Sequence, residues 1–128
     1  MDAITVLVVD DEADVETLIR QRMRRDIRAG RYDFRFARSG KEALELLEQE
    51  SGSVHLILTD LNMPEMDGFA LLDALSGLDP LIPSVVVSAY EDGERMSRAA
   101  ALGAEGYVVK PVDFKELRGM LEARLDGD

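Results

Sequence analysis

Polar side chains that can do chemistry follow apolar runs of strand length at four places in the chain. Each of these residues stands at the end of such a run: Asp10, Asp11, Asp60, Ser88 and Lys110. The carboxyl ends of parallel strands open onto one edge of a sheet, which is where ligands bind in folds of this kind. If the runs are neighbouring strands, three carboxylates, a hydroxyl and an ammonium group meet at that edge.

Converging carboxylates repel one another unless cations accompany them. Their oxygens suit Mg²⁺, which takes one or two carboxylates together with waters and a phosphate oxygen. Lys110 supplies further positive charge, and Ser88 could donate its hydroxyl to a phosphate oxygen. Asp60 stands alone at the end of its run, whereas Asp10 and Asp11 are adjacent and suit ion binding. Asp60 is therefore the candidate nucleophile that would form an acyl phosphate.

The overall composition predicts a single soluble domain. The chain has 128 residues, 46% of them apolar, which is enough for one core. Its net charge of -11 disfavours direct binding to nucleic acid or to an anionic membrane. It has no cysteine, and no apolar run has the length of a membrane span or the pattern of a leader peptide. We therefore expect a cytoplasmic protein without disulfides or a membrane anchor.

Positive charge is concentrated in one segment, residues 20–38. This segment has a net charge of +6, against -17 for the remainder of the chain. Its arginines are Arg20, Arg22, Arg24, Arg25, Arg28, Arg31, Arg35 and Arg38. Two interpretations remain open: the cations offset the carbonyl pole of a helix, or they form a docking surface for an acidic partner.

Strand and helix patterns alternate five times along the chain. Apolar or alternating runs predict strands at 4–9, 32–37, 54–59, 84–88 and 106–109. A helical pattern follows each of them, with capping boxes at 39–42 and 113–116, and the first helix starts at Glu12 and ends at Gly30. This order predicts an α/β fold with a single doubly wound, five-stranded parallel sheet and five helices on its two faces. One domain, 1–128 with a core from 4 to 125, accounts for the whole chain.

The motifs at the predicted strand ends resemble those of the receiver domains of two-component response regulators. In chain order they are Asp10-Asp11, Asp60 followed by Met63-Pro64-Glu65-Met66-Asp67-Gly68, Ser88-Ala89 and Lys110-Pro111. The resemblance covers residues 4–125. The chain departs from the family pattern in the arginine-rich segment, which is longer by about one helical turn. It also has a serine at position 88, where threonine is commoner.

The resemblance implies the strand order 2-1-3-4-5 of the flavodoxin-like fold. It implies that a sensor histidine kinase or a histidine phosphotransfer protein phosphorylates Asp60. Asp11 and Asp60 would bind Mg²⁺, or Mn²⁺ as an alternative, with Asp10 acting through water and the backbone carbonyl of Asn62 as a further ligand. Asn62 and Tyr90 would flank the path of the hydrolytic water and tune the lifetime of the phosphoryl group.

The resemblance also implies a conformational switch. Ser88 and Lys110 would contact the phosphoryl group, and Tyr107 would turn inward as Ser88 is drawn to it. The surface of the fourth helix, fifth strand and fifth helix would then change its affinity for a downstream effector, or for a C-terminal output domain absent from this chain. The chain would catalyse only its own phosphorylation and dephosphorylation and is not expected to be a conventional enzyme.

Other functions on the same sheet remain open. An aspartyl phosphatase is one, because Glu12 follows Asp10 at the right distance, although Asp14 stands where threonine or valine is expected. A flavin or dinucleotide binder is another, although acids replace the glycines expected after the first strand. A third is a receiver that binds partners without phosphorylation.

Individual residues also have purely structural interpretations. Asp10 and Asp11 could cap the first helix. Tyr107 could be a half-buried strand aromatic, and Pro111 permits a cis peptide bond after Lys110. We assign no role to the sole histidine, His55.

Overall fold

The computed structural model describes residues 3–78 and 81–126, apart from the side chains of residues 51 and 124–126. The strands are β1 (Ile4–Val9), β2 (Tyr32–Ala37), β3 (Leu56–Thr59), β4 (Ser84–Ser88) and β5 (Gly106–Val109). The helices are α1 (Ala13–Arg22), α2 (Arg24–Arg28), α3 (Gly40–Glu50), α4 (Gly68–Leu75), α5 (Gly93–Ala101) and α6 (Phe114–Asp126), with a short 3₁₀ helix η1 (Ser51–Ser53).

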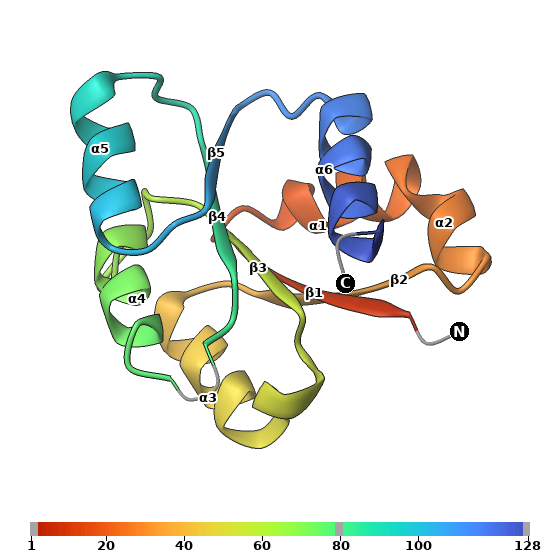
Figure 1. The fold of residues 1–128 in the computed structure, drawn as a ribbon, viewed down its shortest axis with the longest axis horizontal. Helices are drawn as coiled ribbons and strands as arrows, with labels where there is room; N and C mark the ends of the chain where they lie inside the picture. Colours follow the sequence, from red (N-terminus) through yellow and green to blue (C-terminus); the bar gives the residue numbers. More distant parts are fainter. Residues whose placement is uncertain (1–2, 79–80, 127–128) are drawn as a thin grey trace.

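The five strands are all parallel and form one sheet in the order β2-β1-β3-β4-β5 (Figure 1). This confirms the predicted α/β class, the doubly wound sheet and the strand order. The strands β1 and β3 lie inside the sheet and are buried on both faces, apart from the first residue of β1. Their unbroken apolar sequences are typical of such central strands.

Two helical layers cover the sheet (Figure 1). On one face, α1, α2 and α6 pack over a core that includes Met23, Leu56 and Leu117. On the other face, α3 and α4 pack over a core that includes Leu7 and Leu71, and α5 packs beside α4 over β4. None of the helices in the described part of the chain is long and apolar enough to cross a membrane.

The first predicted helix is divided in two, so the described residues form six α-helices and not the five predicted. Met23 lies between α1 and α2 with φ -104° and ψ 13°. Its side chain is fully buried, so the apolar stripe runs through the break and the sequence pattern does not reveal it. At the break, the carbonyl of Arg22 accepts a hydrogen bond from Arg118 Nη2 of α6 at 3.2 Å. A partner so distant in sequence could not be read from the local pattern.

His55 has a structural role that the sequence did not indicate. The ring nitrogen Nδ1 of His55 accepts a hydrogen bond from the backbone N–H of Thr5 at 3.0 Å. The backbone N–H of His55 donates to the Thr5 carbonyl at 2.9 Å. The side chain thus takes the place of a backbone acceptor at the start of the β1–β3 pairing. For this reason β3 begins at Leu56 and not at residue 54 as predicted.

Candidate functional site

Backbone hydrogen bonds align the loops that carry the predicted site residues. Asp10 N–H donates to the carbonyl of Ala37, and Asp60 N–H donates to the carbonyl of Val9, both at 3.0 Å. Lys110 N–H donates to the carbonyl of Ser88 at 2.8 Å. Each bond continues the pairing of two parallel strands by one step beyond their ends. The sheet register therefore fixes where these side chains emerge.

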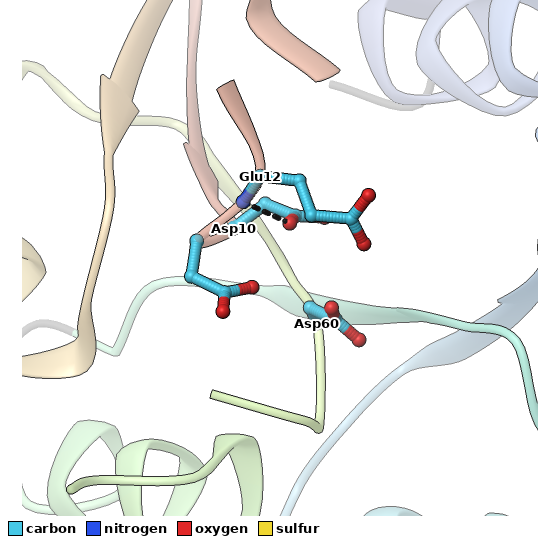
Figure 2. Close-up of side chains that lie close together, drawn as sticks. Asp10, Glu12 and Asp60 are labelled. Carbon is cyan, nitrogen blue, oxygen red and sulfur yellow. Dashed lines mark hydrogen bonds between the residues drawn. The ribbon is translucent and has the colours of Figure 1, made fainter. Parts of the chain in front are cut away.

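Carboxylates gather at this edge of the sheet, as predicted (Figure 2). Asp10, Asp11, Glu12 and Asp60 each offer one carboxylate oxygen, and these oxygens all lie within 4.8 Å of one another. Asp10 and Asp60 are buried, whereas Asp11 and Glu12 are exposed. The sequence analysis did not include Glu12 in this group. Glu12 N–H donates a hydrogen bond to Asp10 Oδ1 at 3.0 Å, and this bond turns the chain back toward the other carboxylates. The spacing of two residues from Asp10 was the feature of the sequence that indicated this position for Glu12.

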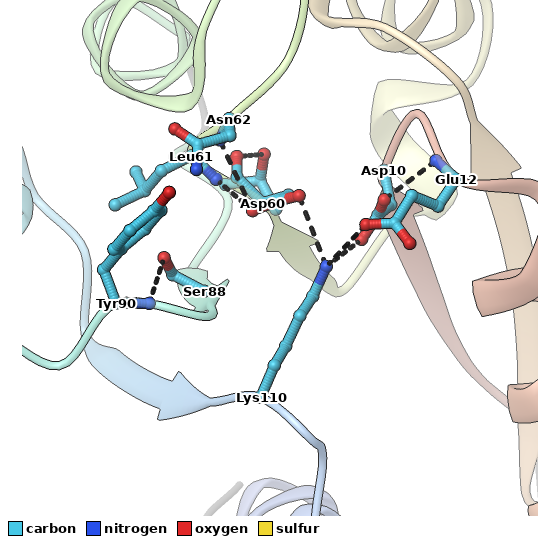
Figure 3. Close-up of polar contacts among 9 residues, drawn as sticks. Asp10, Glu12, Asp60, Leu61, Asn62, Ser88, Tyr90 and Lys110 are labelled. Carbon is cyan, nitrogen blue, oxygen red and sulfur yellow. Dashed lines mark hydrogen bonds and ion pairs between the residues drawn. The ribbon is translucent and has the colours of Figure 1, made fainter.

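Lys110 is the cation that the described residues bring to these carboxylates (Figure 3). Its Nζ lies 2.8 Å from Asp10 Oδ2, 3.3 Å from Asp60 Oδ2 and 3.8 Å from Glu12 Oε1. Burial alone would lower the pKa of Lys110, but the hydrogen bond to Asp10 and the nearby negative charges outweigh it. The pKa of Lys110 is therefore raised, and the ammonium group stays charged.

Asp60 is held on both carboxylate oxygens. Its Oδ1 accepts hydrogen bonds from the N–H groups of Leu61 at 2.7 Å and Asn62 at 3.4 Å, while Oδ2 faces Lys110 (Figure 3). Burial nevertheless raises the pKa of Asp60 above its ordinary value, and the negative charge of Asp10 adds to this. Lys110 and the backbone donors oppose the shift without cancelling it. The site is therefore short of positive charge.

The loop after Asp60 returns very close to the strand end. Gly68, the first residue of α4, donates its N–H to the Leu61 carbonyl at 2.9 Å. A Cβ at Gly68 would lie 2.2 Å from the backbone oxygen of Asp60, so any side chain there would displace the loop. Within the same loop, Glu65 has φ +67°, in the left-handed region that non-glycine residues rarely adopt. The compact loop fixes the backbone that presents Asp60.

Ser88 and Tyr107 are linked through one residue, Tyr90. Ser88 is fully buried, and its Oγ accepts a hydrogen bond from Tyr90 N–H at 3.2 Å (Figure 3). The Tyr107 hydroxyl donates to the Tyr90 carbonyl at 2.6 Å, and its half-buried ring packs against the core shared by α4 and α5. The predicted switch residues are therefore coupled through the loop after β4. The Lys110–Pro111 bond is cis, in agreement with the possibility noted for that proline.

The donor set fits a hard divalent cation. All of the acidic ligand atoms are carboxylate oxygens, and three of the four carboxylates pair with one lysine. Mg²⁺ takes such oxygen ligands and leaves positions for water and a phosphate oxygen, and Mn²⁺ accepts the same donors. Asn62 is exposed beside the cluster, where the sequence analysis placed its carbonyl as a further ligand.

Comparisons with known proteins agree with this arrangement. A family model described as response regulator receiver domain matches residues 6–122. The transcriptional regulatory protein ZraR of Escherichia coli is 36% identical over 124 residues, which cover 97% of this chain and 27% of that protein. The two-component response regulator ORR1 of Oryza sativa is 34% identical over 119 residues, which cover 88% of this chain and 52% of that protein. The chain thus spans about a quarter to a half of these two relatives.

Solved structures show the same fold. The chemotaxis protein CheY4 of Vibrio cholerae superposes with a TM-score of 0.79 at 28% identity, covering 94% of this chain and 97% of that one. The signal receiver domain of an HD domain-containing protein from Pseudomonas fluorescens superposes with a TM-score of 0.85 at 25% identity, covering 98% of this chain and 96% of that one.

Proposed function

This chain belongs to the family of response regulator receiver domains, and from that premise we propose that it is a signalling switch whose phosphoacceptor is Asp60. The observation that carries the proposal is the environment of the Asp60 carboxylate. It is buried at the end of β3, 3.3 Å from Lys110 and within 4.8 Å of three other carboxylates. A buried carboxylate among other carboxylates needs a further cation. Phosphoryl transfer to an aspartate uses both the carboxylate, as nucleophile, and a cation.

In the proposed reaction, a carboxylate oxygen of Asp60 attacks the phosphorus of a phosphohistidine on a sensor kinase or a phosphotransfer protein. A carboxylate–phosphorus bond forms, the phosphorus–nitrogen bond breaks, and the histidine nitrogen keeps the electron pair. Bound Mg²⁺, held by Asp11 and Asp60 and through water by Asp10, would supply charge neutralisation for the phosphoryl oxygens. The N–H groups of Leu61 and Asn62 hold Oδ1 of Asp60, so Oδ2, which contacts Lys110 in this structure, would be the nucleophile once Lys110 shifts toward the phosphoryl group.

Lys110 and Ser88 would stabilise the product. Lys110 Nζ is held between Asp10 and Asp60, so a small shift of its end would place it against a phosphoryl oxygen. Ser88 Oγ accepts from Tyr90 N–H and can direct its own proton to another phosphoryl oxygen. Such a move would pull on the loop after β4, because Tyr107 also holds the Tyr90 carbonyl. Asn62 and Tyr90, both exposed beside this site, would then set how readily water reaches the acyl phosphate.

The switch would act on the surface formed by α5, β5 and α6, which are the predicted fourth helix, fifth strand and fifth helix. Moving a two-state equilibrium from 1:99 to 99:1 requires about 5.5 kcal/mol, which a few charge-assisted contacts to a new phosphoryl group can provide. Tyr107 lies on β5, so its reorientation would alter this surface directly. The partner would be a downstream effector or an output domain of a longer protein, and the domain would act in the cytoplasm with its kinase.

Intact-mass analysis after incubation with acetyl phosphate and Mg²⁺ tests the proposal. The wild-type protein should gain the mass of one phosphoryl group, and removal of Mg²⁺ by EDTA should prevent it. Asp60→Asn should gain nothing, whereas Asp73→Asn, which changes an exposed aspartate of α4, should behave as the wild type. Phosphorylation that persists in Asp60→Asn would exclude Asp60 as the acceptor.

A second measurement tests the switch separately. Beryllofluoride with Mg²⁺ mimics the phosphoryl group, so it should shift the amide resonances of Ser88, Tyr90 and Tyr107. The Asp60→Asn variant should show no such shifts. Unchanged resonances at these positions in the wild type would contradict the proposed conformational change.

A further inference from the structure

The arginines of residues 20–38 fall into two groups. Five of them have partners within the described structure. Arg20 and Arg38 pair with Glu16, Arg35 pairs with Asp33 and Glu50, Arg31 pairs with Asp26 and Glu122, and Arg22 lies over the Phe114 ring. The remaining three, Arg24, Arg25 and Arg28, are exposed and form no ion pair or ring contact with any described side chain.

All three unpaired arginines lie on α2, the second part of the divided first helix. We call Arg24, Arg25 and Arg28 the α2 arginine patch. Arg24 and Arg28 are four residues apart, and Arg25 and Arg28 are three apart, so neighbouring side chains share a face of the helix. Like charges at this spacing destabilise a helix. The one acid on α2, Asp26, is buried and pairs with Arg31 and Arg118, so it does not neutralise these three arginines.

A rigid support holds this patch in place. The inward side of α2 carries Asp26, which is 8% exposed. Asp26 Oδ2 accepts a hydrogen bond from Arg118 Nε at 2.9 Å, and Asp26 Oδ1 lies 3.7 Å from Arg31 Nη1. These contacts tie α2 to α6 and to the start of β2. The helix backbone that carries the arginine patch is therefore anchored by the ion pairs on its inward side.

We propose that the α2 arginine patch is a docking site for a short acidic segment of a partner protein. Charge complementarity identifies the chemistry of this partner, since several carboxylates would meet three unpaired guanidinium groups. Removing these three charges from the net -11 leaves -14 for the rest of the chain. The site lies at the amino-terminal edge of the sheet, because Ile4 N–H at the start of β1 bonds to the carbonyl of Arg31, close to the end of α2. It is thus separate from the Asp60 site at the opposite edge.

The size of the patch favours a short peptide over a longer polyanion. The five residues of α2 span about 7 Å, which is close to the Debye length of about 8 Å at physiological ionic strength. A peptide with two or three carboxylates stays within this distance of the arginines. DNA, an anionic bilayer or a second copy of the chain would extend beyond it and meet the repulsion of the remaining acidic surface.

Amide NMR titration with triglutamate tests this proposal, with triglutamine as the probe that has neutral side chains. Triglutamate should shift the amide resonances of residues 24–31 in a salt-dependent manner. The Arg24→Gln/Arg28→Gln variant should bind about 2- to 30-fold more weakly, as expected for the loss of two exposed ion pairs. Lys41→Gln/Lys115→Gln removes the same charge from two exposed lysines on α3 and α6 and should leave the affinity unchanged.

Several outcomes would overturn the proposal. One is equal shifts with triglutamine, and another is an equal loss of affinity in the two charge variants. Larger shifts of residues 24–31 with duplex DNA or with anionic vesicles, at matched probe charge, would assign the patch to another class of partner. Phosphorylation of Asp60 should be the same in the wild type and in Arg24→Gln/Arg28→Gln, so failure here is distinguishable from failure of the proposed switch.

Discussion

Asp60 and Asp26 are both buried, 6% and 8% exposed, yet their surroundings differ in charge. Asp26, near the amino-terminal edge of the sheet, has two arginines within 3.7 Å. Asp60, at the carboxyl edge, shares a single lysine with Asp10, and two more carboxylates lie close by. The two arginines balance the charge of Asp26, whereas one lysine does not balance the carboxylates around Asp60.

Asp26 is a buried carboxylate whose charge the fold itself pairs, whereas the carboxylates around Asp60 outnumber the one lysine beside them. Asp26 ties α2 to α6 through contacts that the fold itself completes. Around Asp60 the contacts within the fold are not enough: burial and the negative charge of Asp10 raise its pKa, and Lys110 and the backbone donors only partly oppose the shift. Buried ionic groups that the fold does not neutralise are candidates for function.

The largest effect is expected from a change that moves the Asp60 backbone itself. In Gly68→Ala, the new methyl group would lie 2.2 Å from the Asp60 carbonyl oxygen and 2.7 Å from Leu61 Cα. We expect a loss of about 3 kcal/mol in the free energy of unfolding, because backbone on both sides must shift. Urea denaturation measures this loss, and phosphorylation by acetyl phosphate should slow in the same variant.

Gly93→Ala is the matched control. Gly93 is also the first residue of a helix that follows an aspartate cap, but nothing lies within 4 Å of a Cβ built there. It should unfold like the wild type or be slightly more stable. Equal destabilisation of the two variants would show that the close approach at Gly68 is unimportant.

A smaller effect is expected from removing one cation at Asp26. Arg118→Met keeps most of the side-chain volume but leaves Asp26 with Arg31 alone, at 3.7 Å. Breaking a buried pair costs about 3–5 kcal/mol, and since the Arg118 side chain is 37% exposed we expect about 2 kcal/mol. Thermal or urea unfolding measures the change, and Mg²⁺ affinity should be unaffected. Lys115→Met on the same helix should cost almost nothing, and a similar loss in both would contradict the comparison.

The smallest effect, of opposite sign, is expected at Asp60. Because the folded protein binds the Asp60 proton more firmly than the unfolded chain, Asp60 contributes its full stability below the ordinary pKa of aspartate. That contribution is lost as pH rises through the raised pKa. Without Mg²⁺ at neutral pH, Asp60→Asn should therefore be more stable than the wild type, by up to about 1 kcal/mol.

Urea unfolding of both proteins across the acidic to neutral range tests this expectation. The advantage of Asp60→Asn should shrink as pH falls through the raised pKa, because protonation then removes the charge from the wild type as well. Mg²⁺ should stabilise the wild type more than the variant, by about 1.4 kcal/mol at ten times its dissociation constant. If Asp60→Asn is less stable than the wild type at neutral pH, the charge of Asp60 is balanced by the fold, as that of Asp26 is, and the comparison fails.

Local patterns in the sequence predicted the five strands and their carboxyl ends, whereas the strand order came from the family resemblance. Unbroken apolar runs identify central strands, and the polar residues that follow them must meet at one edge when the strands are parallel. The convergence of Asp10, Asp11 and Asp60 was predicted in this way and is observed. Their roles as ligands and acceptor stay predictions until the experiments above are done.

Features that depend on contacts between distant segments could not be predicted. The break at Met23 coincides with a hydrogen bond from Arg118, far along the chain, while the apolar stripe continues without interruption. The bond from the Thr5 N–H to the His55 ring likewise requires the register of two strands. The approach of Glu12 to Lys110 depends on a turn whose direction the residue types alone do not fix.

Met66 in the loop after Asp60 rests directly on Gly40, the first residue of α3. A Cβ on Gly40 would lie 2.7 Å from Met66 Sδ, so the thioether occupies the space that a side chain would need. Oxidation of Met66 to its sulfoxide would add a polar oxygen to a contact that has no room for one. We therefore expect oxidation of the half-buried Met66 to disturb the packing of the loop after Asp60 on α3, even though the chain contains no cysteine.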